Sequence, residues 1–126
     1  MNGKTRILVV DYDEDVSFIV APILEKMGYE VVGVANGPEA IRAAASQRFH
    51  LALVDIKMPD MREREAIRRM RNLNPRLPLI LITDSPDWAD AELREATQEF
   101  LYKPLRPAQL KLTIERVLGG AGQEEP

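Results

Sequence analysis

Short apolar runs alternate with helical patterns five times along this chain of 126 residues. A strand with one solvent-exposed face alternates polar and apolar residues. Most of these runs lack that alternation, so they predict strands buried on both faces. Such strands, each followed by a helix, indicate a parallel sheet with helices on both sides and right-handed crossovers. The expected strands are residues 4–10, 29–35, 51–55, 77–82 and 100–102.

For five parallel strands, the common doubly wound order is 2-1-3-4-5. We therefore predict an α/β, flavodoxin-like fold with a doubly wound five-stranded parallel sheet and five helices. Gly28 is expected to end the first helix and Gly119 with Gly120 the last, because glycine is frequent at helix C-termini. Pro22 should bend the first helix or delay its start. The expected helices cover about 16–27, 39–47, 62–73, 86–96 and 107–118.

Apolar residues that recur at helical spacing predict the buried face of each helix. For four of the helices they are Val16, Ile19, Val20, Ile23, Leu24 and Met27; Ala40, Ile41, Ala44 and Ala45; Ala66, Ile67, Met70 and Leu73; and Leu110, Leu112, Ile114, Val117 and Leu118.

The composition is that of one ordinary domain, with 45% hydrophobic residues and enough length for a proper core. Residues 1–120 are expected to form the domain and residues 121–126 a flexible tail or the start of a linker. A net charge of −3 does not call for nucleic acid or a membrane surface. No cysteine, long apolar stretch or signal peptide occurs, which fits a cytoplasmic protein.

Polar side chains stand where four of the predicted strands end. Asp11 ends the first strand and Asp55 the third, while Thr83 and Lys103 follow the fourth and fifth. In the predicted strand order, the ends of the first and third strands flank the topological switch point, where ligands bind. We therefore expect Asp11 and Asp55 to face each other, with Thr83 and Lys103 completing the rim.

This set of side chains suggests phosphoryl chemistry. Two carboxylates held close together repel, so they need a proton or a divalent cation, and Mg²⁺ suits oxygen ligands. A lysine and a hydroxyl that converge on one point would bind a phosphoryl group. An aspartate can itself be the nucleophile. The residues thus predict an aspartate that is phosphorylated with metal help, its acyl phosphate held by Thr83 and Lys103.

Residues 5–118 resemble the receiver domain of two-component response regulators. The resemblance rests on the strand that ends in Asp11, on Asp55-x-x-Met58-Pro59, on Thr83 after a Leu-Ile strand, and on Phe100-Leu-x-Lys103-Pro104. These motifs match the family in order and in spacing.

The resemblance implies a role for each matching residue. Asp55 would be the phosphoacceptor, and Asp11, Asp55 and the backbone carbonyl of Lys57 would hold Mg²⁺. Thr83 and Lys103 would bind the phosphoryl group. Thr83 and Phe100 would form the conformational switch, and the Lys103–Pro104 peptide bond would be cis. The expected phosphoryl donor is a histidine kinase or a phosphotransfer protein.

The resemblance also implies an output surface on the fourth helix, fifth strand and fifth helix, which would contact an effector domain or a downstream protein. Trp88 on the fourth helix is either a core residue or an anchor for such a partner. We expect no direct binding of nucleic acid or membrane. The domain is not expected to be an enzyme beyond its own phosphorylation and dephosphorylation.

Three positions depart from the family pattern. Tyr12 stands where a second acid is usual, and a neutral phenol is a poor Mg²⁺ ligand. Asp13 or Glu14 could reach in instead. Asp84 replaces a small residue and adds negative charge beside the phosphoryl site. Arg62 with Glu63 replaces the usual Asp-Gly.

Two alternatives follow from these residues. A degenerate receiver would bind a partner without being phosphorylated. Asp11-x-Asp13 is also similar to the motif of haloacid dehalogenase-type phosphatases, in which Asp11 would be the nucleophile. Against the phosphatase, the usual threonine is absent, no cap domain fits, and Asp55 would have no role.

Two further features have structural interpretations. His50, the only histidine, has no partner at metal-ligand spacing and is expected to be structural. The arginines of residues 62–71 alternate with acids, which favours a solvated helix face.

Overall fold

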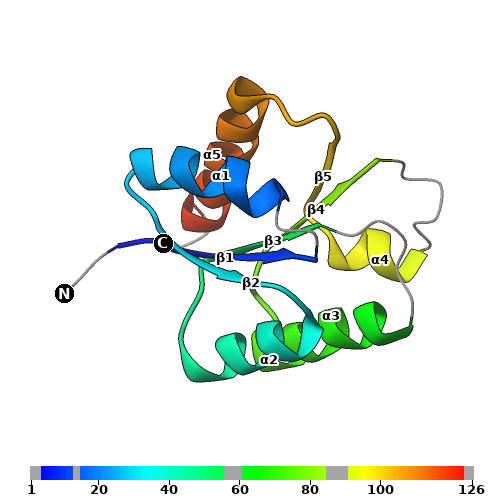
Figure 1. Cartoon of the computed structure of the whole chain (residues 1–126). Coiled ribbons are helices and arrows are strands. Elements are labelled where there is room, and N and C mark those ends of the chain that lie inside the picture. Colours follow the sequence, from blue (N-terminus) through cyan, green and yellow to red (C-terminus); the bar gives the residue numbers. More distant parts are fainter. Residues whose placement is uncertain (1–3, 13–14, 56–60, 85–90, 124–126) are drawn as a thin grey trace.

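The computed structural model describes residues 4–12, 15–55, 61–84 and 91–123. Within these ranges, five parallel strands form one sheet in the order β2-β1-β3-β4-β5 (Figure 1). The predicted α/β fold class and strand order are therefore confirmed. The strands are β1 (Arg6–Asp11), β2 (Glu30–Val34), β3 (Leu51–Asp55), β4 (Leu79–Thr83) and β5 (Glu99–Tyr102).

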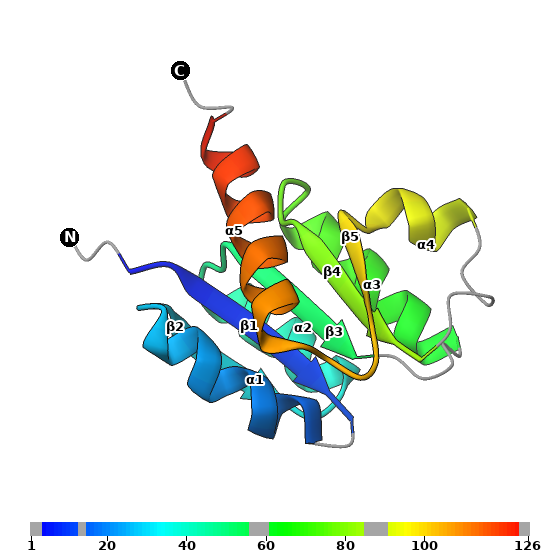
Figure 2. The same ribbon diagram turned by 90° about the horizontal axis from the view of Figure 1, so that it is seen from above.

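In the described ranges, five helices cover the two faces of this sheet. They are α1 (Asp15–Lys26), α2 (Gly37–Ser46), α3 (Met61–Leu73), α4 (Ala91–Ala96) and α5 (Pro107–Gln123). Helices α1 and α5 pack on one face, and α2 and α3 pack on the other, as Figure 1 shows from the side and Figure 2 from above. None of the described helices is both long and apolar enough to cross a bilayer.

Successive side chains of the central strands enter the two halves of the core alternately, as expected for strands covered on both faces. Leu51 and Leu53 of β3 join the half under α1 and α5. Ala52 and Val54 join the half that packs on α2, α3 and Leu93 of α4. All five residues of β3 are buried, so the strand carries Asp55 into the interior at its end.

Local signals explain where α2 begins. The side chain of Asn36 accepts a hydrogen bond from the backbone N–H of Glu39 at 2.9 Å. The carboxylate of Glu39 accepts one from the N–H of Ala35 at 2.9 Å. This arrangement is similar to a capping box, except that Glu39 binds the N–H of the residue before the cap, and Pro38 occupies the first turn, where no N–H is needed. The helix therefore begins at Gly37, two residues before the predicted start.

One prediction about a helix end was wrong, and one of the two effects expected of Pro22 is excluded. Helix α5 continues through Gly119 and Gly120 to Gln123. Glycine ends a helix when it adopts the left-handed conformation, which Gly28 does with φ of 96° and Gly119 does not. Pro22 lies inside α1, which begins at Asp15, so the proline does not delay the helix.

Four apolar side chains that we expected to be buried are exposed. They are Ile19, Ala45, Leu73 and Leu112. The buried face of a helix is a stripe, and on α5 the observed stripe is Leu110, Thr113, Ile114 and Val117. Leu112 is 63% exposed because it lies off this stripe, whereas the polar Thr113 lies on it. Hydrophobicity alone therefore selected the wrong residue at this turn.

His50 has the structural role that we expected. Its Nδ1 atom accepts a hydrogen bond from the backbone N–H of Arg6 at 3.0 Å, and the backbone N–H of His50 donates to the carbonyl of Arg6 at 2.8 Å. These bonds join the starts of β1 and β3. Trp88, whose role we left open, lies outside the described residues.

The arginines of α3 differ in role. Arg68 and Arg69 pair with Glu65 on the surface, as the charge pattern predicted. Arg71 instead is half-buried, and its guanidinium donates hydrogen bonds to the backbone carbonyls of Pro75, Leu77 and Ala96. The last of these carbonyls ends α4, so Arg71 ties α3 to α4. The prediction of a uniformly solvated face was wrong at this position.

We expect Arg71→Met to lower the free energy of unfolding by about 2–3 kcal/mol, because three carbonyls lose a charged donor while the apolar stem is kept. Arg69→Met is the matched control on the same helix. Arg69 is 60% exposed and makes one surface ion pair, worth at most about 1 kcal/mol. Urea unfolding of both variants measures the difference, and equal losses would refute the bridging role of Arg71.

Candidate functional site

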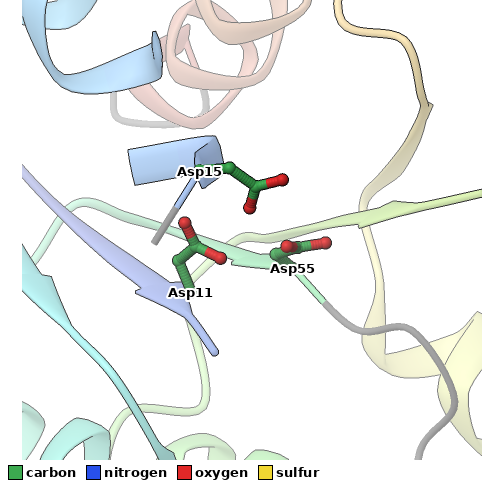
Figure 3. Close-up of side chains that lie close together, drawn as sticks. All are labelled: Asp11, Asp15 and Asp55. Carbon is green, nitrogen blue, oxygen red and sulfur yellow. The ribbon is translucent and has the colours of Figure 1, made fainter. Parts of the chain in front are cut away.

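Asp11 and Asp55 end neighbouring parallel strands and are register partners. Neighbours in register point to the same side of a sheet, so the two carboxylates lie close together, as Figure 3 shows. Asp11 is 1% exposed and Asp55 3% exposed. The predicted juxtaposition of the two acids at the switch point is what the structure shows.

Thr83 and Lys103 lie at the same edge of the sheet. Asp55 pairs in register with Ile82, so Thr83 stands one residue further along β4, and it is buried. The backbone N–H of Lys103 donates to the carbonyl of Thr83 at 3.0 Å. The Lys103–Pro104 peptide bond is cis, as we expected.

The ammonium group of Lys103 reaches Asp55. Its Nζ atom lies 3.0 Å from Oδ1 and 3.2 Å from Oδ2 of Asp55, and only the contact with Oδ2 has hydrogen-bond geometry. Oδ1 is buried and accepts no hydrogen bond from the described residues. Asp55 is thus held by a cation on one side while one of its oxygens remains available to a ligand.

A third carboxylate joins this pair from a residue that we did not single out. Asp15 begins α1, and its side chain points toward Asp11 and Asp55 (Figure 3). One oxygen from each of the three carboxylates lies within 4.8 Å of the other two. The sequence from Asp11 to Asp15 has four acids in five residues, which indicated that a further carboxylate could lie near the site. It did not show which acid turns inward. The two acids that we considered, Asp13 and Glu14, lie outside the described residues.

The first turn of α1 is tied to the end of β1. Asp11 Oδ2 accepts a hydrogen bond from the backbone N–H of Ser17 at 2.6 Å. Asp15 Oδ1 accepts one from the N–H of Val16 at 3.0 Å. Both carboxylates therefore stabilise the start of a helix, where backbone N–H groups lack partners within the helix. The same bonds orient them toward Asp55.

The pKa of Asp55 is raised to about 6 from an ordinary value of 3.8. Burial is the main cause, because it disfavours the charged form. The neighbouring Asp11 raises the pKa further, and the hydrogen bond and charge of Lys103 oppose the rise. One ammonium group thus offsets only part of the cost of an ionised Asp55 in this place.

The pKa of Lys103 is also raised. Burial alone would lower it, but the hydrogen bond and charge of Asp55 and the charges of Asp15 and Asp84 outweigh burial. Asp84 is exposed and follows Thr83, as the sequence implied. Among the described residues, three acids therefore act on the charge of Lys103.

The donor set fits a hard divalent cation. Mg²⁺ takes oxygen ligands at about 2.1 Å, so opposite ligands of an octahedral ion stand about 4.2 Å apart. At least two of the three oxygen pairs would be adjacent ligands, about 3.0 Å apart, so the carboxylates, whose oxygens lie within 4.8 Å of one another, would have to close around the ion. The buried Oδ1 of Asp55 without a hydrogen-bond donor supports this fit. The backbone carbonyl of Lys57, which the resemblance implied as a ligand, lies outside the described residues.

Phe100, the expected switch aromatic, is half-buried on β5. Its ring stacks on that of Tyr102, with centroids 6.5 Å apart and planes 4° apart. It also packs against the half of the core under α2, α3 and α4. Tyr102 is exposed, so the aromatic pair runs from the core to the surface beside Lys103.

Comparisons with known proteins agree with this geometry. The family described as response regulator receiver domain matches residues 7–115. Among curated proteins, the transcriptional regulatory protein ZraR of Klebsiella oxytoca is 33% identical over 121 residues, covering 94% of this chain and 27% of the relative. ZraR of Escherichia coli K12 is 32% identical over 114 residues, covering 89% and 26%. The chain spans about a quarter of the length of these relatives.

Solved structures give the same result. A CheY-like receiver domain protein from Methanospirillum hungatei is 31% identical, with a TM-score of 0.83 and coverage of 97% of this chain and 99% of that one. The receiver domain of sensor histidine kinase PA1611 from Pseudomonas aeruginosa, described with a magnesium ion coordinated in the active site cleft, is 29% identical, with a TM-score of 0.80 and coverage of 93% and 99%.

A third solved structure is TrrA of Thermotoga maritima, described in complex with Mg²⁺ and BeF. It is 26% identical, with a TM-score of 0.78 and coverage of 90% of this chain and 98% of that one. The family match covers most of the chain, and the TM-scores of 0.78 to 0.83 show that these solved structures have the same fold. This chain belongs to the response regulator receiver domain family of two-component systems.

Proposed function

We propose that this receiver domain is a phosphoaspartate switch that accepts a phosphoryl group on Asp55 from a histidine kinase or a phosphotransfer protein. The observation that carries the proposal is the buried Asp55 carboxylate, held 3.0 Å from the Lys103 ammonium and directly beside Asp11. One oxygen of Asp55 would attack phosphorus while the bond from phosphorus to the donor nitrogen breaks, leaving an acyl phosphate.

The residues around Asp55 have separate roles in this proposal. Lys103 would pair with the negative charge of the phosphoryl group, and the hydroxyl of Thr83 would donate a hydrogen bond to it. Asp11, Asp55 and the backbone carbonyl of Lys57 would hold Mg²⁺, which supplies charge neutralisation at the phosphoryl oxygens. Tyr12 should weaken cation binding relative to a receiver with two adjacent acids, and the negative charge of Asp84 should weaken binding of the phosphoryl group.

The response to phosphorylation would be a shift between two conformers. New bonds from the phosphoryl group would draw Thr83 inward and favour the conformer in which Phe100 turns inward. Phe100 and Tyr102, whose rings stack, both belong to β5 and so to the surface of α4, β5 and α5. We propose that this surface contacts an effector domain or a downstream protein.

The proposal concerns the receiver domain only. The curated relatives are transcriptional regulators about three and a half times as long as this chain, so any DNA binding would belong to a separate part of such a protein. Within this domain, the net charge of −3 and the acidic site do not favour nucleic acid. We place the domain at residues 1–120 and in the cytoplasm, and assign it no chemistry beyond its own phosphorylation and dephosphorylation.

A second candidate is a degenerate receiver that binds a partner without phosphorylation. Tyr12 favours it, because a neutral phenol follows Asp11 where an acid is usual in the family. The two candidates differ in their response to a phosphoryl mimic.

Amide NMR spectra with beryllofluoride separate the two candidates. For the switch, we expect beryllofluoride with Mg²⁺ to shift the amide signals of Thr83, Phe100 and Lys103, and Asp55→Asn to abolish these shifts. For the degenerate receiver, beryllofluoride should leave the spectrum of the folded protein unchanged. Shifts of the same size in Asp55→Asn would contradict the assignment of Asp55.

A further inference from the structure

We propose that Asp15 is a metal-binding residue of this site and takes the place of the acid that is missing at position 12. The inference rests on the proposed Mg²⁺-dependent function and deepens it. Its starting point is Tyr12, whose side chain is 37% exposed and offers no carboxylate after Asp11. If Asp11 and Asp55 were the only carboxylates at the site, the cation would have one acid fewer than is usual in the family.

The geometry supplies the missing carboxylate from α1. Asp15 lies four residues after Asp11, and its ligand oxygen is within 4.8 Å of those of Asp11 and Asp55. Figure 3 shows its side chain extending from the start of α1 toward the two strand ends. Asp15 is exposed whereas the other two acids are buried, so it forms the solvent side of the cluster. A cation could therefore reach the site past Asp15.

A second observation points to a ligand among these three acids. Oδ1 of Asp55 is fully buried, and among the described residues no donor makes a hydrogen bond to it. Lys103 contacts this oxygen without hydrogen-bond geometry and supplies one positive charge. Among the described residues, the three carboxylates outnumber the single Lys103 ammonium beside them, and a divalent cation would offset this excess of negative charge.

The hydrogen bonds of the first turn hold Asp15 in position. The N–H of Ser17 binds Asp11 Oδ2 at 2.6 Å and so fixes α1 against the end of β1. One oxygen of Asp15 accepts the N–H of Val16 at 3.0 Å, and the other accepts no hydrogen bond from the described residues. The side chain is thus oriented by the helix while one oxygen is left for a cation.

The test is a titration of the full chain with Mg²⁺ by isothermal calorimetry, with circular dichroism as the check on folding. We expect Asp15→Asn to weaken Mg²⁺ binding at least about tenfold, because even the loss of an outer-shell partner of a metal ligand typically costs about 10–100-fold in affinity. Asp84→Asn is the matched control. Asp84 is an exposed acid at the same edge whose charge also acts on Lys103, but it is not one of the three clustered acids. It should change the affinity by less than about twofold.

A rescue variant makes the test independent of any local damage. Adding Tyr12→Asp to Asp15→Asn restores an acid at the family position and should recover most of the lost affinity. Unchanged Mg²⁺ affinity in Asp15→Asn, an equal loss in Asp84→Asn, or no Mg²⁺ binding by the parent chain at millimolar concentration would each overturn the assignment.

The outcome is separable from that of the proposed function. If the parent chain takes up a phosphoryl group and Asp15→Asn binds Mg²⁺ normally, the Asp15 assignment fails and the switch stands. If Asp15→Asn loses Mg²⁺ affinity while the parent chain takes up no phosphoryl group from acetyl phosphate, the switch fails and the metal site stands.

Discussion

Asp55→Asn should raise the free energy of unfolding of the metal-free protein at pH 8 by about 3 kcal/mol. The pKa of Asp55 is about 6 in the folded protein against 3.8 ordinarily. A tenfold difference in proton affinity corresponds to about 1.4 kcal/mol. Ionisation of the buried carboxyl therefore lowers the stability of the folded state by about 3 kcal/mol. Asparagine has nearly the same shape and carries no charge, so it removes this cost. A substitution at the proposed phosphoacceptor would therefore stabilise the fold.

The same shift fixes the pH dependence. Because the folded pKa lies above the unfolded one, the penalty is complete well above pH 6. It decreases as the pH falls through 6 and vanishes below 3.8. The parent chain should thus gain stability relative to Asp55→Asn as the pH falls from 8 to 5.

Urea unfolding with a chelator present, at several pH values, measures the difference between the two proteins. Asp84→Asn, which removes an exposed acid at the same edge, is the control and should change stability by about 0.5 kcal/mol or less. If Asp55→Asn is no more stable than the parent chain at pH 8, the proposed cost of ionising the buried Asp55 carboxyl is absent.

Lys103→Met should have the second large effect, in the opposite direction. At pH 8 we expect a loss of about 2–3 kcal/mol, because an ionised and buried Asp55 is left without its cation. The loss has a ceiling of about 3 kcal/mol, since Asp55 takes up a proton when ionisation becomes more costly than that. At pH 5, where Asp55 is mostly protonated already, the loss should be small.

A double-mutant cycle tests this interpretation. In the Asp55→Asn background, Lys103→Met should cost less than about 1 kcal/mol at pH 8, because no buried charge remains at position 55. If Lys103→Met lowers the free energy of unfolding equally in both backgrounds, Lys103 stabilises the fold through packing of its methylene groups rather than through its ammonium group.

The sequence was sufficient to predict the sheet and the meeting of Asp11 with Asp55. Unbroken apolar runs predict doubly covered strands, and the strand order then places their ends, so register follows from topology. Asp15 could not be predicted in the same way. Its position depends on how the first turn of α1 packs on the end of β1, through the bond from Ser17 to Asp11.

Side-chain roles on helices were also beyond the sequence pattern at particular places. Leu112 and Thr113 are adjacent, and only the direction of the α5 stripe decides that the threonine is buried. In the sequence pattern, Arg71 does not differ from the other arginines of the charged helix face. Its three carbonyl partners come from the loop after α3 and from the end of α4, which are brought together only by the fold.

Phosphoryl uptake located at Asp55 tests the central claim most directly. The protein would be treated with acetyl phosphate, with and without Mg²⁺, and the acyl phosphate would be reduced with borohydride and mapped by peptide mass spectrometry. The account predicts one phosphoryl group per chain, on Asp55, only when Mg²⁺ is present. Folded protein that binds Mg²⁺ yet takes up no phosphoryl group, or takes it up equally in Asp55→Asn, would contradict it.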